Sequence, residues 1–391
     1  MRLFGFVTLL CGAFAGVGCN GSATGPDGGG VRERWFQPQP GWSWARPGVA
    51  GSVVYFGTGD GQIIARGVNS GQPLWSAKVA NQPVNGANLL VRGGVVIAPI
   101  VSYTVGLDAS TGRELWRFLA PMDTVRRSPA IPGVVASSRI DADDATVFIP
   151  AWGASVSAVD IRTGATRWIW QPGRMESDTA TSGVFRSGSN GVRLSGDTLF
   201  ASVWHHVVPL GGTSEAWVVA LDRLTGTELW RVRLPQQGSI SRPPAVYGNL
   251  VIARTLNAHV FAIDRSTLQI VWHFHSAGAI LSTVSGAEVY GAFVYADGGD
   301  GHLYALRAAT SDLVWKSAFP TQTGADLLVT DRRVIFTNGP ELFVVDRETG
   351  RRVATTSQPR TYDPLFSSPA AYANGLVFVT VGDGAWCFEE P

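Results

Sequence analysis

Cysteine and charge are both scarce in this sequence. Its 391 residues include three cysteines, charged residues make up 16% and the formal net charge is +1. Cys11 and Cys19 lie near the N-terminus, so Cys387 is the single cysteine expected in the folded part. A single cysteine allows no disulfide between folded segments and no cysteine-rich metal site. Without a basic run or a net charge that would attract phosphates, we expect no nucleic-acid binding.

Long apolar runs and helical patterns are scarce as well. The one long apolar run covers residues 3–17, directly after Arg2, and it is too short to span a bilayer comfortably. A positive charge followed by such a run is typical of an export signal. We therefore predict a signal peptide over residues 1–18 and no membrane-spanning segment elsewhere.

The residues around Cys19 resemble a lipoprotein signal, in which the cysteine is lipidated and becomes the mature N-terminus. Small residues precede this cysteine, although Gly16 stands where the motif usually has leucine. We expect Cys19 to carry a lipid anchor, with simple cleavage of the signal as the alternative. Asn20 is compatible with sorting to an outer membrane. Residues 19–32 are rich in glycine and poor in apolar side chains, which predicts a flexible tether.

Glycine and tryptophan, by contrast, are abundant, with 47 and 14 residues. Glycine supplies the positive φ that tight turns between strands need. One pattern recurs along the chain: an apolar strand that ends near Ala-x-Asp, then Thr-Gly, then Trp. The clear copies are VGLDASTGRELW (105–116), SAVDIRTGATRW (157–168), VALDRLTGTELW (219–230) and FAIDRSTLQIVW (261–272), and weaker copies cover 64–75, 304–315 and 343–354.

The tryptophans set the length of the repeat. With Ala354 in place of a seventh tryptophan, successive spacings are 41, 52, 62, 42, 43 and 39 residues. A unit of about 40 residues is typical of one four-stranded β-propeller blade. One tryptophan in each blade favours packing between blades over a ligand cage. The predicted structural tryptophans are Trp35, Trp75, Trp116, Trp168, Trp230, Trp272 and Trp315.

The ends of the chain complete the count of blades. Seven units are complete, and an eighth begins at Ser367 with three strands but no outer strand. Trp35 lies 40 residues before Trp75, in step with the other units, so the missing strand is found at the N-terminus. We predict an all-β, eight-bladed β-propeller of four-stranded antiparallel blades over residues 33–391. The N-terminal strand completes the last blade and leaves no open edge there.

The pattern SSPA…GLVFV…GDG…ALD…TG…LW resembles the PQQ-like repeat, found in the outer-membrane assembly lipoprotein BamB and in quinoprotein dehydrogenases. The resemblance covers residues 33–388. It implies the propeller fold, but its motif residues are turn and packing residues, and one fold supports many functions. The dehydrogenases of this family carry an adjacent cysteine pair beside the cofactor, with Asp and Glu around Ca²⁺. This sequence has no such pair.

Strand order predicts where the insertions lie. Loops from an outer strand to the next innermost strand emerge on the same face as loops from the second to the third strand; we name this the upper face. The Asp-x-x-Thr-Gly turns emerge on the opposite, lower face. The two long spacings place extra residues in predicted upper-face loops at 121–136, 171–190 and 205–215. Loops on a rigid scaffold often carry function, and neutral insertion is the alternative.

Polar side chains are predicted to gather at the same face. His205 and His206 lie in the third insertion, and His273 and His275 share one side of a strand. No carboxylate or cysteine accompanies these histidines by spacing, so we predict no metal site. Long polar residues begin several innermost strands at the mouth of the channel: Arg46, Asn88, Arg139, Arg193, Arg242 and Asp326. Converging arginines would attract an anion or an acidic partner group. The alternative is that these side chains are simply exposed to solvent where each innermost strand begins.

These features favour an exported, lipid-anchored scaffold that binds a protein partner at the cell envelope. We expect no enzyme activity and no cofactor, because no catalytic signature is present. The resemblance implies a monomer at the outer membrane facing the periplasm, with a role in outer-membrane protein assembly; another periplasmic or extracellular location is the alternative. The expected partner-binding residues are Arg46, Arg139, Arg193, Arg242, His205 and His206. The alternatives in function are a PQQ-dependent dehydrogenase and a small-ligand sensor.

Overall fold

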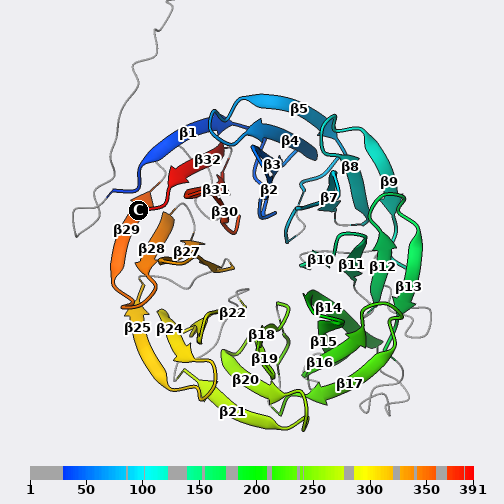
Figure 1. The fold of residues 1–391 in the computed structure, drawn as a ribbon, viewed down its shortest axis with the longest axis vertical. Helices are drawn as coiled ribbons and strands as arrows, with labels where there is room; N and C mark the ends of the chain where they lie inside the picture. Colours follow the sequence, from blue (N-terminus) through cyan, green and yellow to red (C-terminus); the bar gives the residue numbers. More distant parts are fainter. Residues whose placement is uncertain are drawn as a thin grey trace, which may run out of the picture.

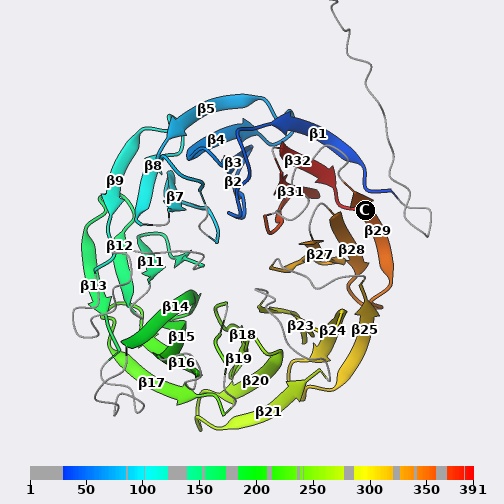
Figure 2. The same ribbon diagram turned by 180° about the vertical axis from the view of Figure 1, so that it is seen from behind.

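The computed structural model shows a ring of eight sheets around a central axis (Figures 1 and 2). It describes residues 30–84, 87–100, 102–121, 139–151, 155–172, 184–208, 214–235, 238–240, 242–276, 286–319, 326–338, 341–357, 368–382 and 384–391, without the side chains of 184–187, 206–208, 214 and 357. The elements within these ranges are strands, β1 to β32. In this part of the chain, no helix has the length and apolar character needed to cross a membrane.

Each blade is a four-stranded antiparallel sheet, ordered from the axis outward. Blade 1 contains β2 (Gly48–Ala50), β3 (Val53–Gly57), β4 (Gln62–Gly67) and β5 (Pro73–Lys78). Blade 2 contains β6 (Leu90–Arg92), β7 (Val95–Pro99), β8 (Thr104–Asp108) and β9 (Glu114–Phe118). Blade 3 contains β10 (Asp141–Ala142), β11 (Thr146–Pro150), β12 (Val156–Asp160) and β13 (Thr166–Trp170). Blade 4 contains β14 (Val184–Ser195), β15 (Thr198–Val208), β16 (Ser214–Asp222) and β17 (Glu228–Arg233).

The second half of the ring repeats this order. Blade 5 contains β18 (Ala245–Tyr247), β19 (Leu250–Arg254), β20 (His259–Asp264) and β21 (Ile270–His275). Blade 6 contains β22 (Ala287–Tyr290), β23 (Phe293–Asp297), β24 (His302–Arg307) and β25 (Leu313–Ala318). Blade 7 contains β26 (Leu328–Val329), β27 (Arg333–Asn338), β28 (Glu341–Asp346) and β29 (Arg352–Ser357). Blade 8 contains β30 (Ala371–Ala373), β31 (Leu376–Val381), β32 (Gly384–Glu389) and β1 (Glu33–Pro38).

The core lies between neighbouring blades. The second strands β7 and β11 are buried at every position, because both faces of a blade pack on neighbours. Such strands are continuous apolar runs in the sequence. The outer strand β5, in contrast, has only half-buried and exposed positions. The cluster around Ile63 and Val96, for example, joins blades 1 and 2.

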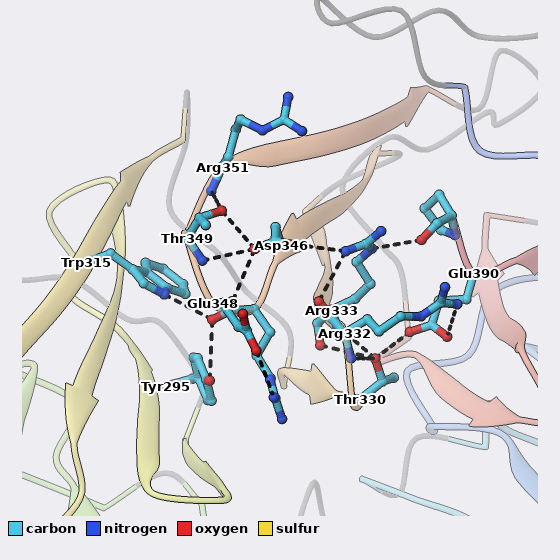
Figure 3. Close-up of polar contacts among 12 residues, drawn as sticks. Tyr295, Trp315, Thr330, Arg332, Arg333, Asp346, Glu348, Thr349, Arg351 and Glu390 are labelled. Atoms are coloured by element: carbon cyan, nitrogen blue, oxygen red, sulfur yellow. Dashed lines mark hydrogen bonds and ion pairs between the residues drawn. The ribbon is translucent and has the colours of Figure 1, made fainter.

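The repeated tryptophan joins its blade to the turn of the next blade. Trp75 donates from Nε1 to the Ala109 carbonyl (3.0 Å), and Trp315 donates likewise to the Arg347 carbonyl (3.0 Å; Figure 3). The glycine of each Thr-Gly pair packs directly on that ring: an added Cβ at Gly112, where φ is +74°, would lie 2.6 Å from the Trp75 ring. Both turn geometry and packing therefore favour glycine at this position, although Leu268 and Ser311 adopt the same positive φ (60° and 65°) in the turns of blades 5 and 6.

The aspartate of the motif organises the turn. Figure 3 shows Asp346 accepting hydrogen bonds from the Thr349 amide (3.0 Å) and hydroxyl (2.8 Å). Asp108, Asp160 and Asp222 accept the same pair of bonds from the threonine three residues later. A side chain that bonds its own downstream backbone fixes the turn locally.

The N-terminal strand closes the ring, as the sequence predicted. β1 pairs antiparallel with β32, with Trp35 opposite Cys387 and Phe36 opposite Trp386. The seam is reinforced by the last residues of the chain. Glu390 accepts hydrogen bonds from Thr330 and from Arg332 (3.3 Å), which ties blade 8 to blade 7 (Figure 3). It also accepts one from Tyr372 (2.9 Å) within blade 8.

Candidate functional site

The innermost strands meet around the axis at their first residues. Arg46 forms a parallel bridge with Asn88, and Arg139 forms one with Gly191, so adjacent blades are hydrogen-bonded to each other here. The Asn88 side chain extends this pattern, donating to the Ile140 carbonyl (3.2 Å) and accepting from the Ile140 amide (3.1 Å). The side chains of this level are therefore held on rigid backbone.

The axial arginines form two ion-paired groups. In one, Glu288 accepts from Arg139 (2.5 Å) and from Arg193 (3.1 Å). In the other, Asp326 accepts from Arg242 (2.5 Å) and lies 3.9 Å from Arg46. The pairs join blades that are not neighbours, because Arg139 belongs to blade 3 and Glu288 to blade 6. We name the six residues the axial cluster: Arg46, Arg139, Arg193, Arg242, Glu288 and Asp326.

Burial and charge shape the protonation of the axial cluster. Burial and the nearby Arg139 lower the pKa of Arg46 to about 10, although Asp326 and Glu288 oppose the shift. Burial would raise the pKa of Glu288, but Arg139 and Arg193 hold it at about 2. Burial likewise disfavours the charge of Arg139, yet Glu288 and Asp326 outweigh it and raise that pKa. Glu288 is therefore ionised at neutral pH.

The alternative interpretation, that these arginines are merely exposed to solvent at the strand beginnings, does not describe Arg242 and Arg46. The Arg242 side chain is 10% exposed and that of Arg46 is 15% exposed, because ion pairs hold them along the axis. Arg193 does not share the register of the other entries: Gly191 stands opposite Arg139, and Arg193 lies two residues deeper in β14. Sequence reasoning missed Glu288, whose place near the start of β22 would have emerged from an alignment of the eight innermost strands.

A cavity adjoins the axial cluster. It has a volume of about 220 Å³ and lies among the innermost strands of blades 4, 5 and 6. Arg193, Ser195 and Glu288 supply its polar lining, and Leu194, Ala245, Val246 and Val289 its apolar lining. The charged side chains of Arg193 and Glu288 therefore border this cavity at the wall of the channel.

Blade 4 is longer than the other blades at the upper face. β14 already begins at Val184, and β15 runs through His205 and His206 to Val208, pairing with β14 on one side and β16 on the other. Two predicted loops, 171–190 and 205–215, are therefore partly strand. The prediction was wrong because the pairing of β15 continues to Val208 with β14 and to His206 with β16. His205 is fully buried, which removes it from the expected partner-binding set.

Several predicted features lie outside the described residues. These are Cys19 with the signal peptide, the His206 side chain, and the first insertion apart from Pro121. The blade 5 histidines are described: His259 stacks on His275 with ring centroids 3.9 Å apart, and its Nδ1 lies 2.7 Å from Nε2 of His273. No group of three His, Cys, Asp or Glu side chains suited to hold a metal ion occurs in the described ranges.

An aromatic pair accompanies the axial cluster at the upper face. The rings of Trp42 and Trp44 lie 4.8 Å apart in the connection from β1 to β2, two residues before Arg46. Trp44 is 40% exposed, which is unusual for a side chain of this size in this molecule. The sequence Trp42-Ser43-Trp44, separated from Arg46 by Ala45, is the signal from which this pair could have been predicted.

The fold and the repeats match known proteins. The sequence profile of the family described as outer membrane protein assembly factor BamB matches residues 22–202 and 152–384. The chain belongs to this family. BamB from Moraxella catarrhalis is similar in structure, with 17% identity and a TM-score of 0.56 over 88% of this chain and 85% of that one.

Dehydrogenases of the same architecture are also similar. Quinohemoprotein alcohol dehydrogenase from Comamonas testosteroni has 13% identity and a TM-score of 0.65, covering 92% of this chain and 76% of its own. At such identity the likeness shows the fold alone. Quinohemoprotein alcohol dehydrogenase ADH IIB of Pseudomonas putida is 34% identical over 97 residues, which is 22% of this chain. The match spans 14% of that curated relative's length.

The donor set on the axis does not fit PQQ with its Ca²⁺. Hard cations such as Ca²⁺ take six to eight oxygen ligands. Here both axial carboxylates, Glu288 and Asp326, are engaged by arginines. The one described cysteine, Cys387, is buried opposite Trp35 in blade 8 and not at the axis.

Proposed function

We propose that this chain is an exported, non-enzymatic scaffold that binds a protein partner at the cell envelope, in the manner of a BamB-type assembly factor. The observation that carries the proposal is the BamB family profile, which covers almost the whole propeller. Lipid anchoring through Cys19 and an outer-membrane location facing the periplasm are parts of the same proposal.

The upper face is the proposed binding surface. Blade 4 extends there, Trp44 is exposed there, and the arginines at the strand entries stand beneath it. Aromatic and arginine side chains are enriched among the few residues that dominate protein–protein affinity. The lower face, in contrast, is made of short turns repeated in each blade.

Matched substitutions on the two faces test this proposal. Trp44 on the upper face and Leu224 in a lower-face turn are both exposed, 40% and 69%. We expect Trp44→Ala to weaken capture of an outer-membrane assembly barrel by about tenfold or more, and Leu224→Ala to leave it unchanged. The measurement is the affinity of the purified protein for that barrel, with thermal melting as a check on folding.

Two results would contradict the proposal. Loss of capture by Leu224→Ala with full capture by Trp44→Ala would move the binding surface to the lower face. Failure of the unsubstituted protein to bind any assembly barrel would remove the assigned role.

A quinoprotein dehydrogenase is the second candidate, favoured by the 34% identity to the Pseudomonas putida enzyme over one segment. We expect no dye-linked alcohol oxidation after incubation with PQQ and Ca²⁺, because the axial carboxylates are held by arginines. A turnover above that of the heated protein would establish this candidate instead.

A further inference from the structure

The axial cluster contains more positive than negative charge. Four arginines face two carboxylates, an excess of +2 among the described residues. Asp141 also acts on Arg139, which reduces the excess to +1. Excess charge in a largely buried site is unfavourable unless an opposite charge compensates it.

The cluster also has unused hydrogen-bond donors. The Nε atoms of Arg46 and Arg193 are buried and have no hydrogen-bond partner among the described residues. Buried donors are normally satisfied, so each such atom requires an explanation. Arg193 is the more informative of the two, because its side chain lines the cavity of about 220 Å³ and is 26% exposed, although its buried Nε does not itself face the open space.

We propose that the cavity beside Arg193 binds a small oxyanion, a carboxylate or a phosphate. Guanidinium groups match both anions in geometry, and their planar donors hold them more specifically than a lysine would. The anion would supply the missing negative charge and accept from Arg193, while Ser195 offers a hydroxyl on the same wall. Glu288 keeps its bond to Arg139 and fixes the orientation of the site.

This inference is independent of the partner proposed above, because it concerns the purified protein and a small anion. Failure of partner capture would leave it standing, and failure of anion binding would leave the partner proposal standing.

The test is calorimetric titration with inorganic phosphate, succinate and acetate at constant ionic strength, with chloride as the reference. We expect saturable binding of at least one oxyanion and a matching rise in melting temperature. Arg193→Gln should weaken binding by about tenfold or more, in line with the loss of a charge-assisted bond. Arg113→Gln, which removes an exposed arginine of equal charge in a lower-face turn, should leave binding unchanged.

A second variant tests anion binding by another route if Arg193→Gln fails to fold. Val246→Phe fills the cavity and retains every arginine, so it should also abolish binding. The inference is overturned if no oxyanion binds saturably, or if binding survives in both variants. Equal loss in Arg113→Gln would show general charge attraction and would overturn it as well.

Discussion

At the scale of the residue, the glycine that follows threonine in the Asp-x-x-Thr-Gly turns has two separate roles. Gly112 adopts a φ of +74°, and its Cα packs against the Trp75 ring. Gly94 has a similar φ of +78°, but an added Cβ there meets nothing within 4 Å. The two positions therefore separate the cost of backbone conformation from the cost of lost packing.

We expect Gly94→Ala to lower the free energy of unfolding by about 1 kcal/mol, the cost of a left-handed non-glycine residue. Gly112→Ala should lower the free energy of unfolding by about 1–3 kcal/mol more than Gly94→Ala does, because the added Cβ would displace the Trp75 ring. Urea denaturation of both variants measures the difference. Equal effects would mean that the tryptophan does not depend on this contact.

Burial makes the axial arginines important for folding, because each compensates the charge of a buried carboxylate. Asp326 is 3% exposed and accepts from Arg242. Among the described residues, replacing Arg242 by alanine would leave Asp326 with the longer ion pair to Arg46 (3.9 Å), and a poorly compensated buried carboxylate is strongly destabilising. An alanine scan of these arginines therefore reports on folding before it reports on any partner.

At the scale of the element, β1 is the strand on which closure of the ring depends. Trp35 is 7% exposed, packs on Phe56 and Phe378, and donates from Nε1 to the Val68 carbonyl (2.8 Å). It thereby joins blade 8 to blade 1, although most of blade 8 comes from the other end of the chain.

A variant beginning at Gly41 lacks β1 and should lose stability markedly. Loss of a buried tryptophan alone costs about 3–5 kcal/mol, and the bare edge of β32 adds the risk of association. A variant beginning at Gly30 retains β1 and is the matched control. Identical melting temperatures for the two would show that β1 does not close the ring.

At the scale of the whole molecule, the repeated turns couple stability to pH. Hydrogen bonds from Ser110 and Thr111 lower the pKa of Asp108 to about 2. The pKa of Asp160 is likewise lowered to about 2, by a hydrogen bond from Arg167 and by those from Thr163. The corresponding aspartates of later blades have lowered pKa values too: Asp222, Asp264 and Asp346.

These depressed pKa values fix the sign of the pH effect. In the unfolded chain an aspartate titrates near pH 4, at about its reference value. The stabilisation is therefore fully present above pH 4 and is lost as the pH falls toward 2. We expect the urea midpoint to fall steeply between pH 4.5 and 2.5. Asp222→Asn should reduce that slope, whereas Asp144→Asn, at an exposed position outside these turns, should not. A flat profile would contradict the role of the turns.

The sequence by itself determined the architecture: eight blades, their four strands and the closure by the N-terminal strand. The reason is that these features rest on short-range chemistry. Asp108 bonds to residues two and three positions later, and Trp75 contacts the turn of the next repeat, one unit away. Contacts that recur at a fixed spacing leave a periodic pattern that can be read directly.

Only the tertiary structure decided the character of the candidate site. Arg139 and Glu288 are separated by 149 positions, and they meet because ring closure brings blades 3 and 6 to one axis. Which side chains meet there depends on the level of each residue along its strand. Arg193 lies two residues deeper in β14 than Gly191, the residue opposite Arg139, yet both arginines bind Glu288. The extension of blade 4 depends likewise on pairing between β14, β15 and β16, since a stretch such as residues 203–208 forms a strand only when neighbours satisfy its backbone.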